Sequence, residues 1–429
     1  MDAGRGGPAG GMPGDGGDDG DGRVPWQLGA LIPAALPTAP TFRFWIDEML
    51  WSHGHLATHM IEAALLEAGG QRAGGPTRAA AHVSGSGKML GADHVQRWEL
   101  LWTKSSYALK CARSLRPGQA ISAIVGLNCL TMKKRMQQAL KATYGSAAFD
   151  DIMPLSFALP GELPEWRAWV KSAGGRCPAL WILKTGQDAG RGLALLPTRA
   201  ALAAAESEAA LLLAAGVGGG SIDGSDSAGK SGRGRGGGGR EGGRGRGGGS
   251  GPSSVPKASH QLKVAQLYLP RPLLLEGRKW HARLWLLVTC ASPLRAYVHT
   301  RGLVLFSSDP YDPAIPVSCD GSIAPGHVTN LARNSSGLLL GVDVMVDDEM
   351  RPWLLEFNSS PSIMVEHDDP ATARDIFDEK AAMLRDMVAM VVPRLHRPGD
   401  AGGGDGGGGG GGGEEVAVGG FVPLDVQSA

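Results

Sequence analysis

The sequence predicts an α/β or α+β fold in which part of the central sheet is antiparallel. Short apolar segments of strand length alternate with segments of helical periodicity. Two strand candidates, Val342–Val346 and Trp353–Phe357, are close enough in sequence to form a hairpin, which requires antiparallel pairing. The 67 glycines and 28 prolines gather largely outside these segments, so the folded core is shorter than the 429-residue chain.

Low-complexity segments divide the chain. We expect disorder in an N-terminal tract at 1–23, a Gly/Arg-rich insertion at 216–252 and a Gly-rich tail at 396–429. The arginines of Ser231–Gly249 resemble RNA-binding RGG segments. A surface-loop insertion is the favoured explanation because such insertions cost little entropy, and an RNA-binding loop stays open as an alternative.

Composition excludes several classes of protein. Lys+Arg and Asp+Glu are equal at 42 each, so no net charge indicates a nucleic-acid or membrane partner. The cysteines are odd in number, scattered and without a CxxC pair, which argues against a disulfide framework or a zinc site; they are Cys111, Cys129, Cys177, Cys290 and Cys319. No apolar run approaches the roughly 20 residues of a membrane span. We therefore expect a soluble, intracellular protein.

The elements follow in order along the chain. A helix is predicted over Thr131–Tyr144, with Met132, Met136, Leu140 and Tyr144 on one stripe and Gly145 as its end. A buried strand at Pro178–Lys184 precedes a helix at Thr198–Ala215. The further strand candidates are Val264–Leu269, Arg283–Cys290, Arg295–His299 and Leu303–Phe306. A last helix carries Ile376, Lys380, Met383, Met387 and Val391 on one face and ends at Pro393.

The hairpin RPWLLEFNSSPSI carries polar side chains on an apolar strand. Glu356 and Asn358 share one side of the pleat. If Asp347 pairs with Pro352, Asp343 faces Glu356 at about 5 Å. Two carboxylates and an amide oxygen form a hard-oxygen site that suits Mg²⁺, and a cation would offset the cost of burying both acids. The alternative is a surface hairpin with solvated acids.

Two other segments carry cations suited to phosphate. Lys184 ends a buried strand and is followed by Gly186, Gly190 and Gly192, whose backbone N–H groups could approach phosphate oxygens. Lys279, His281 and Arg283 alternate, so they face one side of a strand. An exposed strand-end lysine and a solvated charged edge are the competing explanations. Arg271, Arg278 and Lys279 form the one basic cluster that could make a groove for an acidic peptide.

Taken together, these segments resemble the tubulin tyrosine ligase-like family, a branch of the ATP-grasp ligases. The similar segments, in family order, are FDDIMPLSFALP (Phe149–Pro160), WILKTGQDAGRGL, QLYLPRPLLLEGRKWHARLWLLVT, FSSDPYD (Phe306–Asp312), HVTN (His327–Asn330) and GVDVMVDDEMRPWLLEFNSSPSI. The resemblance implies an ATP-grasp fold with mixed, partly antiparallel sheets. It places N-terminal and central lobes at 24–172 and a catalytic domain at 173–395.

The resemblance also implies roles for individual residues. The magnesium ligands would be Asp343, Glu356 and Asn358. Lys184, Gly190, Gly192 and Lys279 would hold the nucleotide, with Gln266, Tyr268 and Leu269 against the adenine. The catalytic residues would be Arg283 near the γ-phosphate, and Thr329 and Asn330 in the active-site loop.

The implied activity is ATP- and Mg²⁺-dependent addition of amino acids, glutamate above all, to acidic tubulin tails through an acyl phosphate. The implied partners are tubulin tails or microtubules and a free amino acid, with no membrane or nucleic acid. The expected locations are the cytoplasm and cytoskeleton, including the cilium or basal body.

The chain departs from the family pattern at three places. His281 stands where the family has Asp, and Leu305 where it has a basic residue that Arg301 could replace. The stretch from Asn330 to Asp343 is much shorter than in the family. A catalytically degenerate member that binds microtubules or nucleotide is therefore the alternative function.

Overall fold

The structure, a computed structural model, describes part of the chain. The described residues are 41–46, 55–73, 98–103, 111–112, 115–174, 180–187, 192–216, 256–291, 293–313, 323, 325–327, 339–359, 363, 365, 367–395 and 417–425. The expected disordered tract at 1–23 and, apart from Gly216, the insertion at 216–252 lie outside them. Within these ranges, no helix combines the length and hydropathy that crossing a membrane requires.

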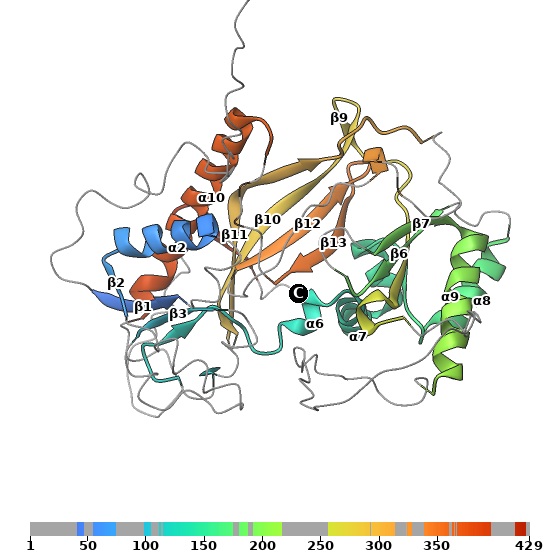
Figure 1. The fold of residues 1–429 in the computed structure, drawn as a ribbon, viewed down its shortest axis with the longest axis horizontal. Helices are drawn as coiled ribbons and strands as arrows, with labels where there is room; N and C mark the ends of the chain where they lie inside the picture. Colours follow the sequence, from blue (N-terminus) through green and yellow to red (C-terminus); the bar gives the residue numbers. More distant parts are fainter. Residues whose placement is uncertain are drawn as a thin grey trace, which may run out of the picture.

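A six-stranded antiparallel sheet forms the centre of the molecule (Figure 1). Its strands run in the order β13–β12–β10–β11–β14, and β9 pairs with one end of β10. They are β9 (Leu274–Leu275), β10 (Arg278–Ala291), β11 (Leu294–Phe306), β12 (Leu339–Val346), β13 (Pro352–Asn358) and β14 (Phe421–Pro423). β10 alternates strictly from Lys279 to Leu287, so its odd-numbered side chains are buried on one face.

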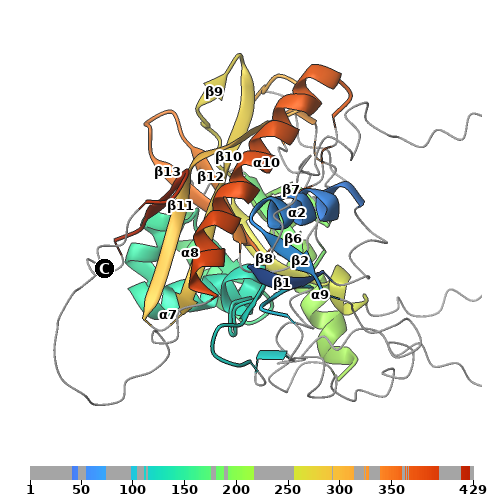
Figure 2. The same ribbon diagram turned by 90° about the vertical axis from the view of Figure 1, so that its left-hand side faces the viewer.

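Helix α10 (Pro370–Val391) crosses one face of this sheet, as Figure 2 shows. Asp369 caps it by accepting a hydrogen bond from the Thr372 N–H at 2.8 Å, and Pro370 fits its first position. The helix ends before a 3₁₀ turn, η7 (Val392–Arg394), that contains Pro393. The expected last helix is confirmed, and its buried face joins Trp285, Leu287 and Tyr297 in the largest hydrophobic core.

A smaller sheet is entirely parallel and lies beside α10. Its order is β2–β1–β3–β4, and helix α2 (His55–Glu67) makes the crossover between its first two strands. The strands are β1 (Phe42–Ile46), β2 (Gly70–Arg72), β3 (Leu100–Trp102) and β4 (Ala120–Ile121). Phe44, Ile46 and Leu65 are buried in the same core as α10, so this sheet is anchored to the central one.

A third sheet, antiparallel, has the order β5–β8–β6–β7 and is covered by helices α8 (Leu163–Ala173) and α9 (Thr198–Ala214) (Figure 1). Its strands are β5 (Ser156–Ala158), β6 (Leu180–Thr185), β7 (Leu193–Pro197) and β8 (Leu262–Leu267), with a 3₁₀ turn, η5 (Ala258–His260), before β8. The fully buried Trp166 and Trp181 pack with their rings tilted by 56° and their centroids 4.9 Å apart. The expected strand before Lys184 and the Ala/Leu helix after it are both confirmed.

The helix predicted over Thr131–Tyr144 is wrong at its start, whereas the predicted interruption at Gly145 is confirmed. The chain forms α6 (Asn128–Thr131), an extended Met132, and then α7 (Lys133–Ile152), with a non-helical Gly145 at φ 79° inside it. Met136 is buried, whereas Met132 is 41% and Tyr144 is 50% exposed. The reason is that α7 packs through Met136 and Phe149 against β13, which leaves both ends of the predicted stripe in solvent.

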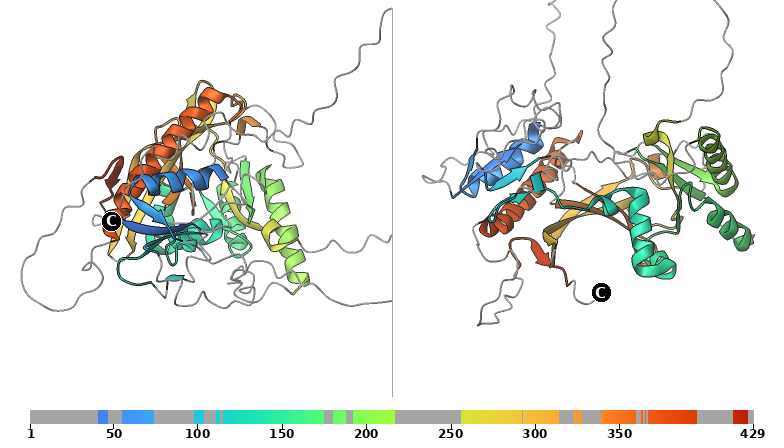
Figure 3. Two further views of the ribbon diagram at one scale, coloured as in Figure 1. Left: turned by 60° about the vertical axis from the view of Figure 1, so that its left-hand side comes forward. Right: turned by 90° about the horizontal axis from the view of Figure 1, so that it is seen from below.

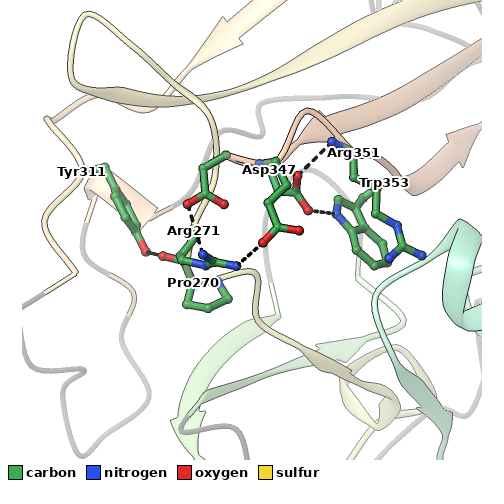
Figure 4. Close-up of polar contacts among 8 residues, drawn as sticks. Pro270, Arg271, Tyr311, Asp347, Arg351 and Trp353 are labelled. Carbon is green, nitrogen blue, oxygen red and sulfur yellow. Dashed lines mark hydrogen bonds and ion pairs between the residues drawn. The ribbon is translucent and has the colours of Figure 1, made fainter.

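The predicted hairpin exists, but its turn is shifted by one residue. Val346 pairs with Pro352 and Met345 with Trp353, where we expected Val346 opposite Trp353. A bulge at Leu355 then restores the expected register, so Asp343 does lie opposite Glu356. Asp347 closes the turn by accepting hydrogen bonds from the N–H groups of Glu349 and Arg351 and from Trp353 Nε1 at 2.8 Å (Figure 4).

The expectation of a disordered tail over 396–429 is wrong for Ala417–Asp425. This segment turns back and adds β14 to the outer edge of β11, as seen at the edge of the sheet in Figure 3. Its composition hid the strand, because Gly419 and Gly420 directly precede it.

Candidate functional site

The centre of the candidate site is a buried ion pair between adjacent strands. Arg283 on β10 lies directly opposite Asp343 on β12, and their side chains are 5% and 2% exposed. The guanidinium donates two hydrogen bonds, from Nε to Oδ1 and from Nη2 to Oδ2, the latter at 2.9 Å. The sequence analysis placed Arg283 near a γ-phosphate; the structure places it on Asp343, whose burial therefore requires no metal.

Glu356 and Asn358 extend the site from β13. Glu356 faces Asp343 across the ladder and is half-buried, and Asn358 Nδ2 donates to Asp343 Oδ2 at 3.2 Å. The structure thus brings together all three predicted magnesium ligands. Their two carboxylates and amide suit an ion that completes its shell with phosphate oxygens and water. A closed protein cage is not available, since the described residues contain no group of three or more His, Cys, Asp or Glu side chains suited to a metal.

Lys184 of the third sheet interacts electrostatically with these acids and with Lys133 of α7. Desolvation lowers the pKa of Lys184 to about 8, and the positive charge of Lys133 acts in the same direction, while Glu356 and Asp343 act against it. Lys133 donates from Nζ to the Gln187 carbonyl at 3.0 Å. The sequence analysis gave Lys133 no role. Its signal was a cation at the first position of α7, where the helix dipole disfavours positive charge.

The turn after Lys184 needs glycine at Gly192. This residue has φ +68°, and its carbonyl accepts from the Thr185 N–H at 2.9 Å. A Cβ there would overlap Thr185 Oγ1 and lie 2.7 Å from Gln187 Oε1. The close return of the chain therefore excludes a side chain. Gly190 lies outside the described residues.

Lys279 and His281 lie on the same face of β10 as Arg283. Lys279 is 3% exposed, and its Nζ lies 4.1 Å from the centroid of the Tyr268 ring. Desolvation lowers the pKa of Lys279 to about 7. Desolvation likewise lowers the pKa of His281 to about 4, although Asp343 acts against it with a carboxylate 3.8 Å from Nε2. His281 is thus a neutral group at neutral pH.

The predicted adenine-facing residues end and follow β8. Gln266 is buried and donates from Nε2 to Ser156 Oγ at 2.9 Å, which ties β8 to β5. The Tyr268 hydroxyl lies 2.6 Å from His327 Nδ1, and desolvation raises the pKa of Tyr268. Leu269 is half-buried. His327 belongs to a short turn, η6 (Pro325–His327), and its partnership with Tyr268 was missed by the sequence analysis.

The predicted basic groove is wrong. Arg271 is paired with Asp348 at 3.5 Å and with Glu349 at 2.8 Å beside the hairpin turn (Figure 4). Arg278 donates to the Ser307 and Ser308 carbonyls, and Lys279 is buried. These three basic residues therefore have separate surroundings and do not form one basic surface.

Arg301 does not replace the missing basic residue at Leu305. Leu305 pairs with His281 across the ladder, whereas Arg301 forms an ion pair with Glu379 on α10. Thr329, Asn330 and the short stretch that follows them up to Leu338 lie outside the described residues.

Comparison with known proteins gives a consistent result. Residues 112–336 and 317–397 match the Tubulin-tyrosine ligase family. A tubulin polyglutamylase of Caenorhabditis briggsae is 25% identical over 166 residues, covering 23% of this chain and 27% of the relative. A tubulin monoglutamylase of Mus musculus is 26% identical over 178 residues, 26% of this chain and 15% of the relative. A probable tubulin polyglutamylase of Homo sapiens is 20% identical over 341 residues, 64% of this chain and 47% of the relative. The chain spans less than half the length of each of these relatives.

Proposed function

Because the chain belongs to the tubulin-tyrosine ligase family, a branch of the ATP-grasp superfamily, we propose that it is an ATP- and Mg²⁺-dependent ligase. Its mixed sheets and helices form the α+β fold expected for that family. We further propose that it adds glutamate to acidic tubulin tails, as the names of its relatives suggest. Such an enzyme would act in the cytoplasm on the cytoskeleton, including the cilium or basal body.

One observation carries this proposal: acids and lysines of four elements, β6, β12, β13 and α7, act on one another at a single place. Lys184 on β6 interacts electrostatically with Glu356 and Asp343 of the central sheet and with Lys133 of α7. Oxygen donors on one side and ammonium groups on the other are the charges that a Mg²⁺–polyphosphate complex requires.

The proposed roles follow from this placement. ATP would supply the phosphoryl group that activates a carboxylate as an acyl phosphate, with Mg²⁺ offsetting its charge. Asp343, Glu356 and Asn358 would hold the ion, and Lys184, Lys279 and the Gly192 turn would hold the nucleotide. Gln266, Tyr268 and Leu269 would position the adenine. Arg283 fixes the Asp343 carboxylate by two hydrogen bonds and so orients it, while Thr329 and Asn330 stay assigned to the active-site loop.

The alternative function is nucleotide or microtubule binding without catalysis. One observation favours it: Arg283, the cation expected near the γ-phosphate, donates from both Nε and Nη2 to Asp343. His281 adds a neutral imidazole where the family has a carboxylate.

Glu356→Gln tests the proposal, with Glu349→Gln in the exposed hairpin turn as the matched control. We expect ATP- and Mg²⁺-dependent incorporation of labelled glutamate into tubulin by the unchanged chain and by the control. Incorporation by the Glu356→Gln variant should fall by about 100-fold or more, since the substitution removes one carboxylate charge from the site. Calorimetric titration with ATP and Mg²⁺ separates the two functions. Nucleotide binding without incorporation of any amino acid would support the non-catalytic alternative, and neither binding nor incorporation by folded protein would refute the ligase.

A further inference from the structure

The outer edge of β11 is covered by a short segment from far along the chain. Phe421–Pro423 pairs antiparallel with Tyr297–His299 (Figure 2). Thr300 N–H donates to the Gly420 carbonyl at 2.9 Å, and Leu424 N–H donates to the Ala296 carbonyl at 2.9 Å. The segment is thus held by main-chain hydrogen bonds, as in peptides that add a strand to a sheet edge.

The segment also buries one aromatic side chain in the core. Phe421 is fully buried in the largest core, and its ring meets the His299 ring edge-on with centroids 4.8 Å apart. Trp285 also meets that imidazole edge-on, with centroids 5.6 Å apart. The following Leu424 is 37% exposed. Burial therefore concentrates on a single position of the segment, which is how an anchor residue gives specificity.

Two glycines before Phe421 meet a polar feature of the edge. Asp386 Oδ2 accepts from the Gly420 N–H at 2.8 Å and from His299 Nε2 at 3.2 Å. A Cβ on Gly420 would lie 2.6 Å from His299 Cε1, and a Cβ on Gly419 would lie 2.9 Å from Asp386 Cβ. The edge of β11 therefore favours glycine at both positions, 419 and 420.

His299 is held in position by its own strand. A bulge in β11 lies opposite Trp285, and within it the Arg301 N–H donates to His299 Nδ1 at 3.1 Å. On its other side, His299 Nε2 lies 3.2 Å from Asp386 Oδ2 on α10. The receptor half of the contact is thus built by β10, β11 and α10, independently of the segment.

The segment lies outside the residues that match the family, which end at 397. It is joined to α10 through residues 396–416, in which every residue from 402 to 413 except Asp405 is glycine. Without the segment, β11 would be an edge strand with unpaired main-chain groups.

We propose that the β11 edge, with His299 and Asp386, is a binding site for an extended peptide of the pattern Gly-Gly-Phe, which this chain fills with its own segment Ala417–Asp425. The same segment supplied as a separate peptide occupies the site when the attached copy cannot. Main-chain pairing supplies the affinity, the buried Phe421 side chain supplies the anchor, and the contact with Asp386 and His299 selects glycine.

The experiment uses the full chain with Gly420→Ala, whose attached segment can no longer dock, and a fluorescent synthetic peptide of residues 416–426. We expect saturable binding of the peptide to this variant and little binding to the unchanged chain, whose site is filled. Peptides carrying Gly420→Ala or Phe421→Ala should bind about tenfold more weakly or worse, and the Leu424→Ala peptide within about twofold, since Leu424 is partly exposed.

A second measurement covers the case in which the Gly420→Ala chain fails to fold. A protease site placed among residues 402–413 of the otherwise unchanged chain allows the tether to be cut after folding. The released segment should then leave on dilution and be displaced by the synthetic peptide. Equal binding of the Gly420→Ala and unchanged peptides, or no saturable binding to either form of the protein, would overturn the proposal.

Discussion

Arg283 and Asp343 face each other on adjacent strands and are joined by two hydrogen bonds in the interior of the central sheet. Neither side chain is more than 5% exposed. A buried pair of this kind contributes little net stability while intact. Loss of one partner, however, leaves the other charge buried and unpaired in the protein interior.

Asp343→Ala should therefore lower the free energy of unfolding by about 3–5 kcal/mol. Glu206→Ala, which breaks the exposed pair between Arg167 and Glu206, is the matched control and should change it by less than about 1 kcal/mol. Urea denaturation measures both. Equal effects of the two substitutions would show that the Arg283 charge is compensated by another group.

Lys279 should make the stability of the protein depend on pH. Its folded-state pKa is lowered to about 7, whereas a lysine in an unfolded chain titrates near 10.4. Between these values the unfolded chain binds more protons, so the contribution of Lys279 to the free energy of unfolding rises with pH above about 7. The unchanged protein should gain stability relative to Lys279→Met by up to about 1.4 kcal/mol per pH unit between about pH 7 and pH 9. Urea denaturation at a series of pH values measures both free energies of unfolding. If the two depend on pH in the same way across this range, the lowered pKa is contradicted.

Gly192→Ala separates two reasons for glycine in the turn after Lys184. At Gly216, which ends α9 with φ +71°, a Cβ would meet nothing within 4 Å, so alanine there should cost only the backbone strain of about 1–2 kcal/mol. At Gly192 the overlap with Thr185 adds to this strain, and we expect a larger loss together with weaker nucleotide binding. Thermal unfolding and ATP titration of both variants provide the comparison. Identical losses would mean that Thr185 moves aside at no cost.

Tyr268 makes two kinds of contact that substitution can separate. Tyr268→Phe keeps the ring beneath the Lys279 ammonium and removes the hydroxyl that bonds to His327 and Tyr311, which should cost about 0.5–1.5 kcal/mol for each hydrogen bond lost. Tyr268→Leu removes both kinds and should cost more. The two free energies of unfolding, from urea denaturation, give the comparison. If Phe and Leu cost the same, the cation–π contact contributes nothing.

Much of the fold follows from sequence periodicity, but the partners at its centre do not. The sequence predicts that Lys279, His281 and Arg283 face one side of a strand, and the structure confirms this. The strand itself was expected over Arg283–Cys290 and begins earlier, at Arg278, because the alternation extends back to Lys279. Which acid faces those groups depends on strand order, because β12 adds beside β10 from about 60 residues away. The sequence therefore predicted that these groups share one face of a strand, and it missed the pairing of Arg283 with Asp343.

Local irregularities account for the other differences. The hairpin pairing of Asp343 with Glu356 was predicted from an unshifted turn and is reached instead through a turn that starts one residue off and a bulge at Leu355. Either change alone would have moved Glu356 to the opposite face of the sheet. The strand at Phe421 was missed because glycine normally weakens a strand, and here the glycines are required by contact with Asp386 and His299.

The alternation of β10 has a further consequence for how this chain can change over generations. Lys279, His281 and Arg283 point the same way as Trp285 and Leu287, so one face of β10 carries polar groups over its first half and core side chains over its second. Insertion or deletion of a single codon between Arg283 and Trp285 would turn one half over relative to the other, so that the two halves could no longer share a face. Substitutions can therefore alter the chemistry of this face one residue at a time, whereas a single insertion or deletion here would disrupt the face as a whole.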